Sequence, residues 1–293
     1  MNPYLAALPG FDEDAYLAHN ADVREAVERG HFRSTWDHFS GYGYRERRRG
    51  VDQAIVEEFL RLKQAIDATL PPAGLRKRVH GIEDASSFEA IGALTAADIA
   101  RAVRGTGALA PRRIFDFGCG CGRVLKHLRT QFPEAAFVGS DIDTDAISWC
   151  AGKLQGTATF MVNADLPPLA LANADFDLVC ANSVFTHLPE DMQFAWLEEL
   201  ARVTTSGGLF VASIHGEFAT SSIPLTAAQR LAWQSAGFLY LEIGATSGLP
   251  DYYRTACHQP EYVHRSWGRW FDIIDIIHRG LAGHQDIVIA RRR

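Results

Sequence analysis

A glycine-rich turn limits most strongly what this chain can fold into. Residues 114–117 form a short apolar run, Gly118, Gly120 and Gly122 follow, and a segment with helical periodicity begins at Arg123. Glycine adopts positive φ at little steric cost and lets a ligand approach the backbone closely. The first turn of a helix presents N–H groups without intrahelical partners, which suit an anionic group. The sequence therefore predicts a strand, a ligand-binding turn and a helix in succession.

Strand-like and helix-like segments alternate after this turn. The expected strands are residues 114–117, 136–139, 159–162, 176–181 and 209–214, and the expected helices are 123–130, 144–154 and 190–203. Such alternation predicts a parallel sheet covered by helices on both faces. Residues 271–277 and 286–290 are two more apolar strands, and the short link between them requires an antiparallel hairpin. We expect an α/β fold, with a Rossmann-like seven-stranded sheet whose last strand is antiparallel, plus a small N-terminal helical region.

The N-terminal part of the chain has a different character. Its first fifty residues are rich in aromatic and charged side chains, and residues 12–29 favour one or two short helices. A further amphipathic helix follows, and residues 70–74, with two prolines and a glycine, interrupt the chain. We expect residues 1–72 to form a helical module with a linker helix, and residues 73–293 to form the α/β domain.

Composition excludes several classes of protein. The net charge of −6 disfavours a general nucleic-acid binder, which needs a basic face. The odd number of cysteines, five, does not indicate a disulfide framework, and neither cysteines nor carboxylates have the spacing of a metal site. No apolar run reaches the roughly 20 residues of a membrane helix, and the first residues do not resemble a signal peptide. We expect a cytoplasmic protein without metal or membrane span, and the oligomeric state stays open.

The position of an acidic residue indicates the kind of ligand. Asp141 ends the second expected strand, nineteen residues after Gly122. A carboxylate at that place can accept hydrogen bonds from ribose hydroxyls. A dinucleotide-binding fingerprint that starts at Gly118 requires a glycine where Arg123 stands. The pattern therefore favours an adenosine-containing ligand that carries a carboxylate and no pyrophosphate.

Five motifs, taken together, resemble those of class I S-adenosylmethionine-dependent methyltransferases. They are IFDFGCGCGR at 114–123, VGSDID at 138–143, NADLP at 163–167, FDLVCANSVFTHL at 176–188 and SGGL at 206–209. The resemblance covers roughly two-thirds of the chain, through the final hairpin. It implies an enzyme that uses S-adenosyl-L-methionine as its cofactor.

The resemblance also implies roles for individual residues. Gly118, Gly120 and neighbouring N–H groups would flank the methionyl part of the cofactor. Asp141 would hold the ribose, Ile142 would pack on the adenine, and Asp165 would contact the adenine amino group. The expected cofactor-binding residues are Asp116, Gly118, Cys119, Gly120, Asp141, Ile142, Ala164, Asp165, Leu166, Asn182, Ser183 and Val184.

Methyl transfer to a hydroxyl requires a base, and histidine has a suitable pKa. His215 ends the fifth expected strand, at the edge where α/β proteins place their sites. His215 is the first candidate for the base, and His258 is the second. The alternative for His215 is a structural role, as a histidine at a strand end that is bonded to the backbone. The long aromatic segment 216–259 is interpreted as part of a substrate lid, with buried core as the equal alternative.

The first fifty residues resemble a small module found beside bacterial glycosyltransferases and cell-surface proteins. The segments that carry this resemblance are FDEDAYL at 11–17, NADV at 20–23, WDHF at 36–39 and GYRE at 43–46. The leading hypothesis is methyl transfer to a hydroxyl of a small molecule, such as a sugar or an envelope glycoconjugate. An N-methyltransferase of a small amine and a non-catalytic cofactor-binding subunit are the alternatives.

Overall fold

The computed structural model describes residues 2–244 and 248–293. The chain divides into two compact units, Met1–Ala93 and Leu94–Arg293, and each is described by itself. The two units are defined by contacts within the chain. The domain boundary expected between residues 72 and 73 stays a prediction.

Unit 1 is built from helices around a core of aromatic side chains. Its elements are α1 (Glu13–His19), α2 (Ala21–Glu28), α3 (Thr35–His38), the π-helical turn η1 (Phe39–Gly43), α4 (Gln53–Asp67), α5 (Ala73–His80) and the start of α6 (Ala85–Gly105). The Asp12 carboxylate caps α1 by accepting a 2.9 Å hydrogen bond from the Ala15 N–H. Tyr16, Trp36 and Phe59 are buried at the centre of this unit. The short helices expected in residues 12–29 are confirmed as two.

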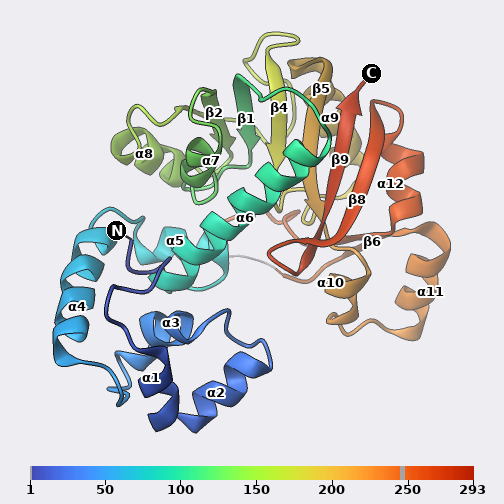
Figure 1. Ribbon diagram of the computed structural model, residues 1–293. Helices are drawn as coiled ribbons and strands as arrows, with labels where there is room; N and C mark the ends of the chain where they lie inside the picture. Colours follow the sequence, from blue (N-terminus) through green and yellow to red (C-terminus); the bar gives the residue numbers. More distant parts are fainter. Residues whose placement is uncertain (1, 245–247) are drawn as a thin grey trace. The chain divides into compact units, whose positions relative to one another are not determined.

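Unit 2 contains the predicted seven-stranded sheet (Figure 1). Its strands are β1 (Arg113–Phe117), β2 (Ala136–Asp141), β3 (Thr159–Val162), β4 (Phe176–Ala181), β5 (Thr204–Ile214), β8 (Phe271–Leu281) and β9 (Gln285–Arg292). The spatial order is β3-β2-β1-β4-β5-β9-β8. Strands β1 to β5 are parallel, whereas β9 runs antiparallel to both β5 and β8. The predicted fold, including the antiparallel last strand and the hairpin, is confirmed.

Helices cover both faces of this sheet because its strands are apolar on both sides. Residues 94–105 of α6, with α7 (Leu125–Gln131) and α8 (Thr144–Lys153), pack on one face. The other face holds α9 (Glu190–Val203) and α12 (Pro260–Trp267). This arrangement leaves the carboxyl ends of the parallel strands as the edge where a ligand can bind.

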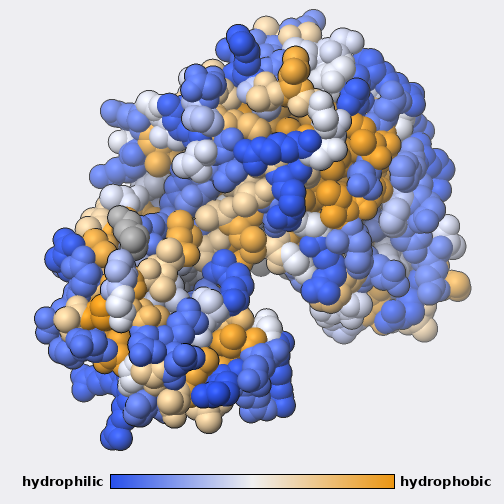
Figure 2. All heavy atoms as spheres, viewed as in Figure 1, coloured by the Kyte–Doolittle hydropathy of each residue, from blue (hydrophilic) through white to orange (hydrophobic). Residues whose placement is uncertain are grey.

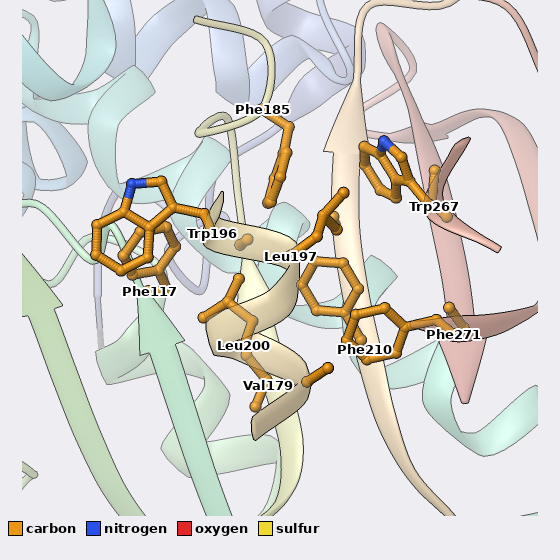
Figure 3. Close-up of a cluster of buried hydrophobic side chains, with 14 of the residues drawn as sticks. Phe117, Val179, Phe185, Trp196, Leu197, Leu200, Phe210, Trp267 and Phe271 are labelled. Carbon is orange, nitrogen blue, oxygen red and sulfur yellow. The ribbon is translucent and has the colours of Figure 1, made fainter. Parts of the chain in front are cut away.

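Aromatic side chains fill the core beneath α9. Figure 3 shows Trp196, Leu197 and Leu200 pointing from α9 toward the sheet. On the sheet itself, the rings of Phe210 and Phe271 stack with their centroids 4.8 Å apart. This contact joins the middle of β5 to the edge strand β8.

The segment between β5 and α12 folds as a small subdomain. It contains α10 (Glu217–Ser221), α11 (Ala227–Ala236) and a two-stranded antiparallel sheet of β6 (Phe238–Leu241) and β7 (Thr255–His258). Strand β7 lies against the end of β5, since His258 N–H donates a 2.9 Å hydrogen bond to the His215 carbonyl. Part of this segment, residues 245–247, lies outside the described residues.

Four further observations concern the surface, the cysteines, membrane-spanning helices and metal ligands. Hydrophobic residues reach the surface in the region of β8 (Figure 2), where Ile274 is 43 % exposed. All five cysteines are free and buried. In the described part of the chain, no helix is both long and apolar enough to span a membrane. Nor do three or more His, Cys, Asp or Glu side chains gather there as ligands for a metal ion.

Candidate active site

The glycine turn is fixed against the ends of β2 and β4. Gly118 and Gly120 have φ values of +74° and +53°, a region that strongly favours glycine. The N–H groups of Gly118 and Cys119 both donate to the Ser140 carbonyl, at 2.8 and 2.9 Å. A Cβ on Gly118 would lie only 2.3 Å from Cγ2 of Val184. The backbone therefore turns in contact with Val184, and a side chain at Gly118 would force this contact apart.

Asp141 holds this turn through its carboxylate. Oδ2 accepts a 2.7 Å hydrogen bond from Gly120 N–H, and Oδ1 accepts a 2.9 Å bond from Asp143 N–H. Burial raises the pKa of Asp141, and these backbone hydrogen bonds act against the increase. A carboxylate oxygen can accept more than one hydrogen bond. Each oxygen of Asp141 can therefore also accept a hydroxyl from a ligand.

Asp116 is a second acid beneath the turn. It is 2 % exposed, and burial, together with the nearby charge of Asp141, raises its pKa to about 7. The guanidinium of Arg123 acts in the opposite direction. None of the described residues forms a hydrogen bond with Oδ2 of Asp116. A buried carboxylate oxygen of this kind is suited to accept from a ligand amine or hydroxyl.

The end of β4 has an unusual backbone conformation. Ser183 has a φ of +56°, which is uncommon for a residue with a side chain. Its N–H donates to Oγ of Ser213 at 2.8 Å, and its hydroxyl donates to Oε1 of Gln285 at 3.0 Å. The neighbouring Asn182 has a buried Oδ1 that accepts no hydrogen bond from the described residues. Strained residues of this kind are concentrated at functional sites.

The third acid expected at the site, Asp165, lies on the surface after β3. Its carbonyl accepts a 3.2 Å hydrogen bond from Nε1 of Trp196. Its carboxylate hydrogen-bonds Tyr252, and this bond adds to burial in raising the pKa of the Tyr252 hydroxyl. Ala164 and Leu166 beside it are exposed, and Ile142 is half-buried. The segment before β7 thus reaches the loop that was expected to contact adenine.

His215 is held as a neutral imidazole. Burial, followed by the neighbouring His187 and His284, lowers its pKa to about 4, while the backbone of Ala256 acts in the opposite direction. The Nδ1 atom is buried and forms no hydrogen bond with the described residues. The Nε2 atom lies 3.4 Å from Nε2 of Gln285.

The orientation of Gln285 determines which nitrogen of His215 is basic. Its Oε1 accepts from the Ser183 hydroxyl, so its NH₂ group faces the imidazole. An amide NH₂ can only donate, so Nε2 of His215 must be the acceptor. The imidazole proton is then on Nδ1, and the lone pair of Nε2 points toward Gln285 at the strand edge.

A second histidine and a tyrosine lie beside His215. His187 Nδ1 is 2.6 Å from the Arg254 carbonyl and therefore donates to it. The ring of His187 stacks on Tyr253 at 4.1 Å and lies 6.0 Å from the ring of His215. The charges of Asp141 and Arg123 both affect the pKa of Tyr253. Burial is the main cause that raises the pKa of Tyr253, and its ring lies against His187.

His258, the second candidate for a base, has a different environment. It is fully buried, and its Nε2 is 2.9 Å from Oε1 of Gln193. Burial lowers its pKa to about 3. The side chain belongs to the core between β7 and α9, and of the two candidates only His215 lies beside Ser183 and Gln285.

Comparison with known proteins identifies the α/β part of the chain. Residues 114–208 match the family model of a methyltransferase domain. This region is a class I methyltransferase domain. The resemblance to the S-adenosylmethionine-dependent enzymes is confirmed, and the matched residues include the glycine turn, Asp141 and Ser183.

Curated relatives match about a third of this chain. A malonyl-[acyl-carrier protein] O-methyltransferase of Hahella chejuensis is 33 % identical over 103 residues, covering 35 % of this chain and 36 % of that protein. A fatty-acid O-methyltransferase of Mycolicibacterium smegmatis is 30 % identical over 100 residues, 34 % of this chain and 36 % of that protein. The chain thus spans about a third of the length of the curated relatives it matches.

A solved structure shares the fold over a longer stretch. The magnesium protoporphyrin IX methyltransferase of Synechocystis, at 18 % sequence identity, aligns with 83 % of this chain and 100 % of its own, with a TM-score of 0.50. At this level of identity the likeness concerns the fold alone.

Some residues of the candidate site, at the carboxyl ends of the parallel strands, were not predicted from the sequence. Gln285 was missed, although it begins the strand that pairs antiparallel with β5 and so must lie near His215. Tyr252 and Tyr253 were recognised only as members of an aromatic segment. Their contacts come from β7 lying against β5, which no local pattern predicts.

Proposed function

We propose that this chain is an S-adenosyl-L-methionine-dependent methyltransferase that acts on an oxygen of a small molecule. The observation that carries this proposal is the carboxylate of Asp141, which supports the glycine turn and still has acceptor capacity on both oxygens. The methyltransferase domain of residues 114–208 supports the same conclusion.

The residues present fit the cofactor. Oδ2 of Asp116, which forms no hydrogen bond with the described residues, would accept from its amino group, and the turn of Gly118 and Gly120 would flank its methionyl part. Asp141 would hold the ribose hydroxyls and Asp165 the adenine amino group. When bound, S-adenosyl-L-methionine supplies a methyl group activated by a positively charged sulfur. The remaining task of the protein is to align the acceptor and to take its proton.

We propose His215 as the group that takes this proton. It is neutral at physiological pH because its pKa is about 4. With its proton on Nδ1, Nε2 can accept a hydrogen bond from a substrate hydroxyl in place of the long, 3.4 Å contact with Gln285, and then take its proton. Ser183 and Gln285 position the imidazole through the hydrogen bond between them and the contact of Gln285 with His215.

Three indications support the proposed class of acceptor. Two relatives that share the domain are O-methyltransferases by name. The N-terminal segments resemble a module found with glycosyltransferases, which supports a sugar or an envelope glycoconjugate. The net charge of −6 favours a small acceptor over a nucleic acid. The five buried free cysteines are compatible with the cytoplasmic location that we propose.

Calorimetry and a labelled-cofactor screen test the proposal. S-adenosylhomocysteine should bind to the full chain, and NAD should not. The screen should offer nucleotide sugars, glycolipids, fatty acids and small amines with methyl-labelled cofactor. Binding of NAD without a response to S-adenosylhomocysteine would contradict the cofactor, and labelling of amines alone would contradict the oxygen acceptor. Binding of S-adenosylhomocysteine without transfer to any acceptor would favour a cofactor-binding subunit.

The pH dependence of the rate follows from the pKa of His215. A base is active when deprotonated, so activity is present above its pKa and is lost as pH falls through it. With a pKa of about 4, kcat at pH 5.5 should stay within about twofold of its value at pH 7.5. A histidine with the ordinary pKa of about 6.5 would lose about 90 % of its activity at that pH. Initial rates with saturating cofactor measure this, and a fall of that size would contradict the neutral imidazole.

Removing the hydroxyl of Tyr252 should weaken cofactor binding. Tyr252→Phe deletes the hydrogen bond that orients Asp165, so the Kd of S-adenosylhomocysteine should rise about two- to tenfold. Calorimetry gives this constant directly. Tyr262→Phe is the matched control, because its hydroxyl also bonds an acid, Glu190, at 2.6 Å, and Glu190 is not among the expected cofactor-binding residues. An unchanged Kd in Tyr252→Phe would show that the orientation of Asp165 is unimportant for binding.

A further inference from the structure

The N-terminal unit contains a cavity that plays no part in the site described above. Its volume is about 450 Å³, within the range of small-molecule pockets. Three tyrosines, Tyr4, Tyr42 and Tyr44, contribute to its wall. All of the residues that line it belong to unit 1.

The charges around this cavity are balanced. Three basic and three acidic side chains line it. Lys63 pairs with Asp67, and Asp67 also accepts a 2.5 Å hydrogen bond from the Tyr4 hydroxyl. Arg45 lies 3.4 Å from Asp84. A site for phosphate or another anion has a surplus of cations, whereas this one offers donors and acceptors in equal measure.

Cations also lie over the tyrosine rings. The guanidinium of Arg45 is 5.8 Å from the centroid of Tyr42 and 5.5 Å from that of Tyr44. The ammonium of Lys63 is 5.8 Å from the centroid of Tyr4 and 5.9 Å from that of Tyr44. Cation–π contacts at these distances restrain both partners. Rings and charged groups are therefore held next to one another in the wall.

The most exposed of these rings is placed by a special backbone element. Tyr42 is 46 % exposed and sits in the π-helical turn Phe39–Gly43. Such turns are rare and are often found at functional sites. A Cβ on Gly43 would lie 2.0 Å from the buried Tyr16 hydroxyl, so the turn is pressed against the core. The core thus fixes the backbone while Tyr42 stays outside.

We propose that this cavity binds a neutral saccharide. The C–H face of a pyranose ring is apolar and packs well on an exposed aromatic ring such as that of Tyr42. Sugar hydroxyls both donate and accept, so they match neighbouring carboxylates and cationic groups. The cavity combines both features in Tyr42, Arg45 and Asp67. This binding does not depend on methyl transfer, because none of these residues belongs to the methyltransferase domain.

Saturation-transfer NMR on the full chain tests the proposal. The probes are maltotriose, cellotriose and triacetylchitotriose, and phosphorus NMR of inorganic phosphate reports on anion binding. At least one trisaccharide should receive saturation on its ring protons. Tyr42→Ala should weaken its binding tenfold or more, whereas Tyr42→Phe should retain it. Arg45→Gln, at a largely exposed side chain, should weaken it as well.

The controls separate a local effect from misfolding. Leu60→Ala removes a side chain of the same unit that is 45 % exposed and does not line the cavity, so binding should be unchanged. All variants should keep the affinity of the wild-type chain for S-adenosylhomocysteine and its circular dichroism spectrum. The proposal is overturned if none of the three sugars receives saturation, if phosphate alone binds, or if Tyr42→Ala binds like the wild type.

Discussion

His215→Ala is expected to lower kcat about 10²–10⁴-fold, the usual loss when a general base is removed. The affinity for S-adenosylhomocysteine should stay nearly the same, because the proposed cofactor contacts come from Asp116, Asp141 and the glycine turn. The variant should also fold, since the contacts that join β5 to β7 at this position are made by the backbone of His215. Single-turnover rates with labelled cofactor measure the chemical step, and calorimetry measures the affinity.

A neighbouring histidine provides the control for this variant. His284 is exposed, and its ring centroid lies 6.5 Å from that of His215. His284→Ala should therefore turn over at close to the normal rate. Near-normal turnover in His215→Ala would exclude the role of a base. That result would favour an acceptor whose methylation needs no general base. Such an acceptor is an amine, or a carboxylic acid of the kind named for one relative.

Asp141→Ala should weaken the binding of S-adenosylhomocysteine by about 1.5–3 kcal/mol, or about 10- to 150-fold. Two effects add in this variant. It removes the acceptor for the ribose hydroxyls, and it also frees the Gly120 N–H that now donates to Oδ2 at 2.7 Å. Asp141→Asn keeps one acceptor oxygen and should lose less. Isothermal titration at constant salt gives the constants for all three proteins.

The control for this loss is the next acid along the chain. Asp143 caps α8 by accepting hydrogen bonds from Asp145 and Ala146. Asp143→Ala should cost about 1 kcal/mol of stability but should change the affinity by less than about threefold. Equal losses of affinity in both variants would mean that the local backbone, and not the ribose contact, controls binding.

The sequence predicted most of the sheet because local signals agree with one another there. The glycine turn, the apolar strands and the short final hairpin each restrict the topology, and together they leave one arrangement. The strand β5 was expected to start at residue 209 and starts at Thr204. The difference arises because Thr204 already pairs with Phe176 of β4, whereas regular pairing resumes only at Leu209; the turn expected at 206–208 is an irregularity within the strand, and Gly207 has a φ of +75°.

The candidate site was only partly predictable. Asp116, Asp141 and Ser183 lie at strand ends, and a known fold order brings strand ends together. His215 and His258 could not be separated by sequence, because the difference between them is burial: one reaches the strand edge and the other bonds Gln193 in the core. Tyr252, Tyr253 and Gln285 join the site through pairing between distant segments, which no short window of sequence contains.

The backbone conformation of Ser183 lowers the stability of the fold, while its side chain orients a residue of the candidate site. A left-handed serine costs about 1 kcal/mol relative to a conformation that L residues prefer, and a glycine at this place would relieve that cost. Glycine, however, has no hydroxyl to orient Gln285. Mutational drift toward a more heat-resistant protein would therefore tend to remove Ser183, and selection for turnover would tend to restore it. With His215 as the proposed base, thermal tolerance and catalytic competence are in competition at this single position of the chain.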